Sequence, residues 1–322
     1  ADYAGLRAEQ AARRVSGDAV QLGIGVSLTV ENTGGGDETS SIVVRPDGTA
    51  SCIVGTSPHG QSHEHTFAHI VAAELGLDPE RVEILHGDTD LSPFGGGTIG
   101  SRSAQLGGSS AYGAAHEAIE RAKDKAAELF EADRADIVFE AGGFHVAGTP
   151  SKALGWADIG EVAADSKFTS AASFAFGACV AVVELDTETG SVTVRSITTV
   201  DDAGVILQPQ LAEGQVHGGL GLAVAAVLYE EMVYGDDGVP KTSNFADYAL
   251  ISAAELPSFE CIEMVTPSPL NPLGIKGVGE SGTVVATPAL HSAVLDALAP
   301  YGVEHIDIPC TPEKVWRALH PA

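Results

Sequence analysis

The sequence predicts an α+β fold made of two hairpin-and-helix subdomains, residues 1–165 and residues 166–322. Strand and helix patterns are interleaved, but strands joined by short turns outnumber strand–helix–strand units. The order strand, turn, strand, glycine–glutamine loop, helix occurs in both halves, which indicates an internal duplication. With 322 residues, 44% of them hydrophobic, the chain can bury one large core or two smaller ones.

The first half begins with a short polar helix and continues mainly as strands. The second strand run is a hairpin, because Pro46, Asp47 and Gly48 supply turn chemistry between two alternating segments. Gly76 ends the next helix. The expected elements are a helix at 4–15, strand runs at 22–33 and 41–56, a helix at 64–75, a strand at 81–85, a glycine-rich loop at 92–103, a helix at 111–131 and a hairpin at 136–148.

The second half repeats the hairpin pattern, with its turn at residues 186–190. A helix rich in small residues follows, and such a helix must pack closely against its neighbours. The expected elements are a hairpin at 174–204, helices at 213–231, 281–298 and 312–319, and a strand at 258–265.

Charge and cysteine usage limit the function classes. The formal net charge of −27 repels duplex nucleic acid and anionic membranes, which favours small-molecule or protein partners. The longest apolar run, residues 220–228, is too short to span a bilayer, and no signal-peptide pattern begins the chain. Four separate cysteines without C-x-x-C spacing exclude an iron–sulfur site within this chain and favour a cytoplasmic location. Because it begins with Ala1, the chain is a processed chain or a piece of a longer protein.

The segment Gly277-Val-Gly-Glu-Ser-Gly282 fits the dinucleotide fingerprint G-x-G-x-x-G. That fingerprint must follow a strand, but Pro267, Pro269 and Pro272 stand directly upstream, which disfavours a nicotinamide-linked Rossmann enzyme. Two interpretations of Glu280 remain open. It complements the positive end of the following helix, or it is a general base held on a glycine-permitted turn.

Three further glycine segments have the character of backbone opened to a ligand: Gly60-Gln61-Ser62, Gly95–Arg102 and Gly214-Gln215. An arginine after a glycine-rich loop suggests an anion such as phosphate, although glycine is also the ordinary residue of surface turns. The histidines around Gln61 suggest a zinc site, but no H-E-x-x-H motif occurs.

These segments together resemble the molybdenum-binding large subunit of the xanthine oxidase and aldehyde oxidase family, and are closest to the large chain of aerobic carbon monoxide dehydrogenase. Residues 58–77, 82–103, 213–231 and 271–290 carry the resemblance, in the family's order. It covers nearly the whole chain and corresponds to the C-terminal, molybdopterin-binding half of that subunit. It implies a molybdopterin cofactor with molybdenum, often in the cytosine dinucleotide form, bound by both subdomains.

The resemblance also implies the site residues. Glu280 matches the catalytic glutamate, which removes a proton from a molybdenum-bound hydroxyl; the oxygen then attacks a carbon atom and hydride passes to a metal sulfido group. No protein ligand to the metal is implied. The cofactor-binding residues implied are Gly60, Gln61, Ser62, Gly97, Thr98, Gly100, Ser101, Arg102, Gln215, Lys276, Gly277, Val278 and Gly279.

The resemblance implies that the chain works together with further subunits and with the rest of the large subunit. Iron–sulfur and FAD subunits would receive the electrons, and the missing N-terminal half of the large subunit would complete the substrate pocket. The substrate would be carbon monoxide, an aldehyde or an N-heterocycle. Two positions depart from the family pattern: Ser62 stands where glycine is common, and residues 201–210 lack the usual Asn-Pro or His-Pro. The alternative function is a non-catalytic cofactor-binding or assembly fragment that lacks the substrate half.

Overall fold

The computed structural model describes residues 1–92 and 94–321. Pro93, in the predicted glycine-rich loop, and Ala322, the last residue of the predicted second subdomain, lie outside the described residues. The elements are α1 (Tyr3–Ser16), β1 (Val20–Val44), β2 (Ala50–Val54), α2 (His63–Leu75), β3 (Val82–Leu85), α3 (Ser109–Phe130), β4 (Ile137–Glu140), β5 (Gly143–Val146), α4 (Trp156–Ile159), β6 (Val162–Asp186), β7 (Val192–Asp201), α5 (Pro209–Leu228), β8 (Phe259–Glu263), α6 (Ser281–Leu298) and α7 (Pro312–Leu319).

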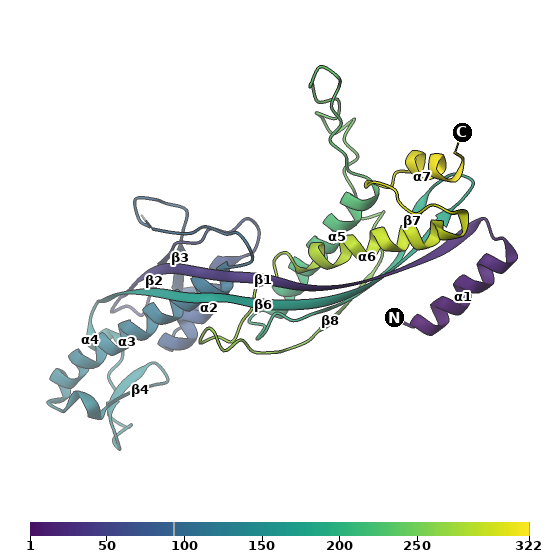
Figure 1. Ribbon diagram of the computed structural model, residues 1–322. Coiled ribbons are helices and arrows are strands. Elements are labelled where there is room, and N and C mark those ends of the chain that lie inside the picture. The colour runs from purple at the N-terminus through teal and green to yellow at the C-terminus, as the bar shows by residue number, and fades with distance from the viewer. Residues whose placement is uncertain (93, 322) are drawn as a thin grey trace.

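Two 25-residue strands, β1 and β6, form the spine of a six-stranded sheet with the order β3-β2-β1-β6-β7-β8. They pair antiparallel in one register, from Val20 opposite Asp186 to Val44 opposite Val162, and run through the length of the molecule (Figure 1). On one side β2 is antiparallel to β1 and β3 parallel to β2; on the other, β7 and β8 repeat this arrangement against β6. The two halves therefore share one topology, as the predicted duplication requires.

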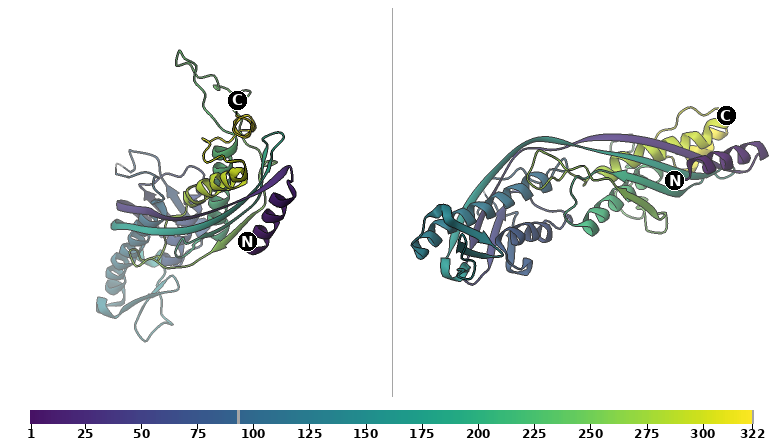
Figure 2. Two further views of the ribbon diagram at one scale, coloured as in Figure 1. Left: turned by 45° about the vertical axis from the view of Figure 1, so that its right-hand side comes forward. Right: turned by 90° about the horizontal axis from the view of Figure 1, so that it is seen from below.

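Two hydrophobic cores lie at opposite ends of this spine. The first core joins β2, α2, α3 and the β4–β5 hairpin, whereas the second joins β7, α5, α6 and α7. Helix α1 covers the other face of the sheet at the α6 end, where Leu6 packs on Leu22 and Ile24 (Figure 2). The mixed helix-and-sheet fold confirms the predicted class. The division at residues 165/166 stays a prediction, since β6 continues across that position.

Glycine lets α6 lie directly on β1 and on α5. A Cβ at Gly23 or Gly25 would lie 2.0 or 1.9 Å from a backbone carbonyl oxygen of α6. Helix α5 crosses α6 at Gly219 and Gly282, where a Cβ on Gly282 would lie 2.5 Å from the Val216 carbonyl oxygen. These contacts fix the start of α6, and therefore Glu280, against the sheet and α5.

Four sequence-based expectations need correction. The strand runs at 22–33 and 41–56 were expected to be separated, but β1 is continuous through Gly34, Gly35 and Gly36. Those glycines have positive φ, yet the strand keeps its register because β6 pairs with Gly34 and with Gly36 on either side of Gly35. For the same reason β6 begins at Val162, twelve residues before the expected start at 174. Helix α5 begins at Pro209 rather than 213, and the short α4 was not expected.

Two helices within the described residues, Pro209–Leu228 and Ser281–Tyr301, are long and apolar enough to cross a membrane by length and composition alone. The buried helices of a protein core pass the same test, and these two pack on each other and on the sheet. Between β8 and α6 the described residues contain no strand, so the Rossmann alternative is not supported.

Candidate functional site

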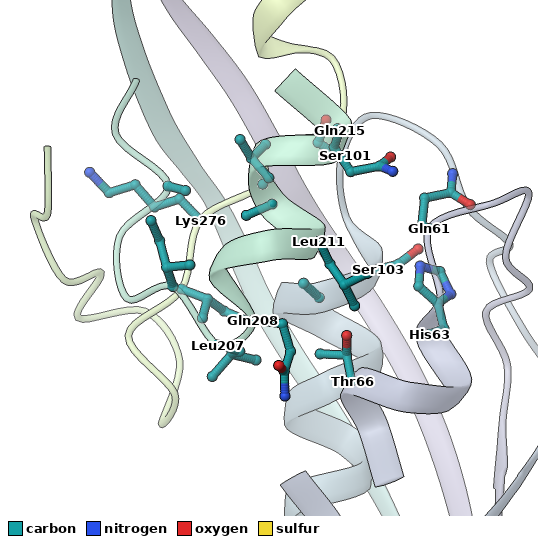
Figure 3. Close-up of a pocket in the computed structure, with 18 of the residues that line it drawn as sticks. Gln61, His63, Thr66, Ser101, Ser103, Leu207, Gln208, Leu211, Gln215 and Lys276 are labelled. Carbon is teal, nitrogen blue, oxygen red and sulfur yellow. The ribbon is translucent and has the colours of Figure 1, made fainter. Parts of the chain in front are cut away.

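A pocket of about 1010 Å³, counting the open space at its mouth, lies where the starts of α2 and α5 meet the loop that precedes α6 (Figure 3). The Gly97–Ser103 loop, the loop after β7 and the 275–280 loop complete its wall. Ten of the fourteen sequence-predicted site residues line it: Gln61, Thr98, Gly100, Ser101, Gln215, Lys276, Gly277, Val278, Gly279 and Glu280. Gly60, Ser62, Gly97 and Arg102 do not.

The three helix starts around the pocket lack a side-chain cap. Ser62, Gln208 and Glu280 are the N-cap residues of α2, α5 and α6, and none of them caps its helix with a side-chain hydrogen bond. In contrast, α1 and α7 lie away from the pocket and are capped by Asp2 and Thr311. Uncapped N-termini with their macrodipoles give the pocket a positive potential within an acidic protein, which suits an anionic ligand.

Arg102 is committed to the protein rather than to the pocket. Its guanidinium donates to Glu38 Oε2 at 2.9 Å and to the carbonyl oxygens of Gly97 at 2.9 Å and Asp37 at 2.7 Å. Both side chains of the Arg102–Glu38 pair are buried, with 9% and 1% of their surface exposed. Arg102 therefore holds the glycine-rich loop on β1, and other residues of that loop, from Thr98 to Ser101 and Ser103, line the pocket.

Lys276 contributes only part of its length to the pocket. Its amine points away from the neighbouring side chains in Figure 3. The amine donates to Asp202 Oδ2 at 2.6 Å and lies over the Phe176 ring. Burial acts to raise the pKa of Asp202, but hydrogen bonds from Lys276 and two backbone amides outweigh it and hold the pKa below its usual value. This ion pair anchors the 275–280 loop.

A chain of buried polar groups fixes that loop against the sheet. Gly277 N–H donates to Thr33 Oγ1 at 3.2 Å, and Thr33 hydrogen-bonds Ser173, which donates to Gln105 at 2.6 Å. Gln105 lies in a π-helical turn, residues 104–108, and such turns are frequent at functional sites. A Cβ at Gly277 would lie 2.2 Å from the Ser101 carbonyl oxygen, so the two loops touch backbone to backbone.

Two serines beside the pocket adopt left-handed backbone conformations. Ser62 has φ 55° and Ser101 has φ 51°. That region favours glycine, which explains why glycine is common at the position of Ser62 in the family that the sequence resembles. Strained positions of this kind concentrate at ligand-binding sites.

Glu280 stands at the N-cap of α6 and at the edge of the pocket, as one of its lining residues. Ser101 Oγ donates to Glu280 Oε2 at 2.8 Å. A second carboxyl group, Glu31 on β1, lies next to it. Burial first, and then the hydrogen bond and charge of Glu280, raise the pKa of Glu31 to about 7. The arrangement presents an oriented carboxylate that can accept a proton from a ligand in the pocket.

Sequence reasoning missed several lining residues. His63 was considered only as a zinc ligand, but burial lowers the pKa of its imidazole to about 4, so the ring is neutral, and its Nδ1 is buried without a hydrogen-bond partner. Gln208 and residues 205–207 also line the pocket. The Gln208-Pro209 step was a usable signal, since proline favours the first turn of a helix. Within residues 1–92 and 94–321, no three metal-ligating side chains are grouped, which leaves the zinc alternative without support.

The family model described as the molybdopterin cofactor-binding domain matches residues 1–257, most of the chain. The chain belongs to the molybdopterin cofactor-binding domain family. The large chain of carbon monoxide dehydrogenase from Hydrogenophaga pseudoflava is 35% identical to the present chain, over 99% of the length of the present chain. A 6-hydroxypseudooxynicotine dehydrogenase complex subunit gamma from Paenarthrobacter nicotinovorans is 36% identical over 94%.

Solved structures agree with the family assignment. Cu,Mo-CO dehydrogenase superposes on 99% of this molybdopterin cofactor-binding chain with a TM-score of 0.91 at 32% identity. Quinoline 2-oxidoreductase from Pseudomonas putida 86 covers 98% with a TM-score of 0.89 at 33% identity. The chain spans 43% and 40% of the length of the two relatives named above, and 44% of each of these structures. The family is one of molybdenum-containing oxidoreductases, which confirms the resemblance given by the sequence.

Proposed function

We propose that the chain is the cofactor-binding half of a molybdenum hydroxylase, an oxidoreductase in which Glu280 is the catalytic base. One observation carries the proposal: three uncapped helix starts and the amides of Gln61 and Gln215 surround a pocket that ends at a hydrogen-bonded carboxylate. Anion binding and proton acceptance are thereby combined in one site.

The residues around the pocket fit a molybdopterin cofactor. The uncapped starts of α2 and α5 would take its phosphate groups, and Gln61, Gln215 and neutral His63 would hydrogen-bond its polar edges. Separate anion sites at two helices accommodate more than one phosphate, which supports the cytosine dinucleotide form. Gly277, which admits no Cβ, lets the 275–280 loop touch the Ser101 backbone, so that both loops line the pocket together. Gly60, Ser62, Gly97 and Arg102 would support the lining residues from behind.

The bound cofactor would supply the redox centre that takes electrons from the substrate. The chain itself would bind and orient this group, exclude water from the inner pocket and accept the proton at Glu280. Ser101 would hold the Glu280 carboxylate in position through the hydrogen bond that it donates to Oε2. The Lys276–Asp202 and Arg102–Glu38 pairs would keep the two loops in register.

Substrate and partners complete the proposal. The relatives act, by their names, on carbon monoxide, a nicotine derivative and quinoline, so a small carbon substrate or an N-heterocycle is proposed here, with an aldehyde as the further class. Electrons would leave through iron–sulfur and FAD subunits, because this chain lacks clustered cysteines. The remaining part of the large subunit would close the substrate side, and the assembly would be cytoplasmic.

The test replaces Glu280 by Gln in the assembled enzyme. We expect turnover to fall at least a thousandfold while molybdenum content, measured by elemental analysis, stays at wild-type stoichiometry. Glu140→Gln, on an exposed side chain far from the pocket, is the matched control and should change neither value. Full activity of Glu280→Gln would refute the base assignment, and loss of molybdenum from it would indicate a structural role.

A second candidate is a cofactor-binding or assembly module without turnover. Adding the isolated chain to the cofactor separates the two. Tight binding without activity, even after the partner subunits and the remaining large-subunit part are supplied, would support the module.

A further inference from the structure

Glu31 faces the proposed base from the sheet. It lies on β1 opposite Ala175 of β6, and it lines, together with Glu280, a hollow beside the α5–α6 crossing. Glu280 is shared between this hollow and the main pocket. The carboxyl group of Glu31 therefore stands behind Glu280, on the side away from the cofactor pocket.

A small cavity with room for a water molecule lies on the other side of Glu31. Asp201 at the end of β7 and Ser281 also line it. Glu31 Oε2 and both carboxyl oxygens of Asp201 are buried here without a hydrogen-bond partner. Buried acceptors without donors are costly, and protonation of a carboxyl group relieves the cost because it supplies an O–H donor. Burial accordingly raises the pKa of Asp201 as well.

The charged groups around Glu31 are nearly all acidic. Glu280 approaches from α6, and Asp201 and Asp202 from the end of β7. The amine of Lys276 is committed to Asp202, and within the described residues α5 adds no charged side chain to the shared hollow. Adjacent carboxyl groups in such surroundings resist ionising together, so one of them keeps its proton to a higher pH than a solvated glutamate does.

The position of each group decides which one keeps the charge. Glu280 stands at the N-terminal end of α6 and accepts a hydrogen bond from Ser101, so it is the carboxyl group that already has a donor. Glu31 has neither a helix terminus nor a donor at Oε2. The proton of the pair therefore resides on Glu31.

We propose that Glu31 is a positioning residue for Glu280: below neutral pH it holds a proton and donates a hydrogen bond that keeps the Glu280 carboxylate aimed into the pocket. This inference rests on the proposed function of Glu280 as a base. It adds a group from the sheet, far from Glu280 in the sequence, that sets the pH range in which the base works.

The first experiment needs no activity. Carboxyl-¹³C-labelled glutamate is incorporated into the full 322-residue chain, and the carboxyl resonances are titrated by NMR between pH 4 and 9. We expect one glutamate resonance to titrate near pH 7, to be absent in Glu31→Gln, and to move in Glu280→Gln because the two groups are coupled. A titration with every glutamate midpoint below about pH 5.5 would overturn the proposal, whatever the enzyme does.

The second experiment uses the assembled enzyme. Glu31→Gln keeps an N–H donor toward Glu280, whereas Glu31→Leu removes it. We expect Leu to lower kcat about tenfold more than Gln and to move the acid limb of the kcat pH profile upward, with KM little changed. Equal kcat values and equal pH profiles for the two variants would contradict the positioning role. An inactive wild-type assembly would instead count against the proposed function, and the NMR result would still decide on Glu31.

Discussion

Replacement of Arg102 by Met tests whether a buried ion pair holds the glycine-rich loop. The substitution removes three hydrogen bonds, to Glu38 and to the carbonyl oxygens of Gly97 and Asp37. It leaves Glu38, whose side chain is 1% exposed, with only two backbone N–H donors, at 3.1 Å each. An uncompensated buried charge costs about 3–5 kcal/mol, so we expect the free energy of unfolding to fall by about 4 kcal/mol.

Urea denaturation followed by circular dichroism measures this loss. The control is Arg317→Met, which breaks a fully exposed pair with Glu313 on α7 and should cost less than about 0.5 kcal/mol. The double variant Arg102→Met/Glu38→Met removes both charges and should recover at least half of the stability lost. A cost for Arg102→Met no larger than that of the control would refute the account of the loop. Arg102 would then be free to serve a ligand.

Three further outcomes follow from the same structure. Gly282→Ala should cost about 1–3 kcal/mol by forcing α5 from α6, whereas Gly214→Ala, which has open space for its Cβ, should not destabilise; thermal unfolding compares them. Lys276→Met should lower the free energy of unfolding by about 3–5 kcal/mol, because it leaves Asp202 buried without its cation. Urea denaturation above pH 6 measures this loss, and a loss below about 1 kcal/mol would contradict the pairing. The pKa of Glu31 is raised in the folded state to about 7, so its contribution to the free energy of unfolding is complete below its unfolded-state pKa near 4.5 and is lost as pH rises through about 7. Glu31→Gln should therefore flatten the plot of stability against pH between these values by about 3 kcal/mol. An unchanged plot would count against the raised pKa of Glu31.

Local sequence signals predicted those parts of the fold that local chemistry decides. The turn at Asp47-Gly48 and the end of α2 at Gly76 are where glycine and turn residues indicated them. The continuous β1 was not predictable in this way, because its Gly34–Gly36 segment is held straight by β6, which is distant in the sequence. Pairing across the sheet outweighed a local signal that favours a break.

The residues of the candidate site likewise fall into those that the sequence indicated and those that it could not indicate. The resemblance to the family's motifs identified residues that line the pocket, such as Gln61 and Glu280. The motifs predicted that Arg102 contacts the ligand, but Arg102 pairs with Glu38, which lies in no motif and is brought to it only by the fold. Glu31 was missed for the same reason: nothing within its strand indicates that a second carboxyl group will lie beside it.

The unbroken register of β1 with β6 has a consequence for how the protein unfolds. Strand β6 contributes residues to both hydrophobic cores and β1 pairs with it along the spine, so one core cannot open without pulling on the strand that the other core needs. The molecule should therefore behave as a single cooperative unit rather than as two independent foldons. A chain cut at residue 165 would leave β1 in one piece and most of β6 in the other, each with an open edge, and the two pieces should recover the native state only by finding each other.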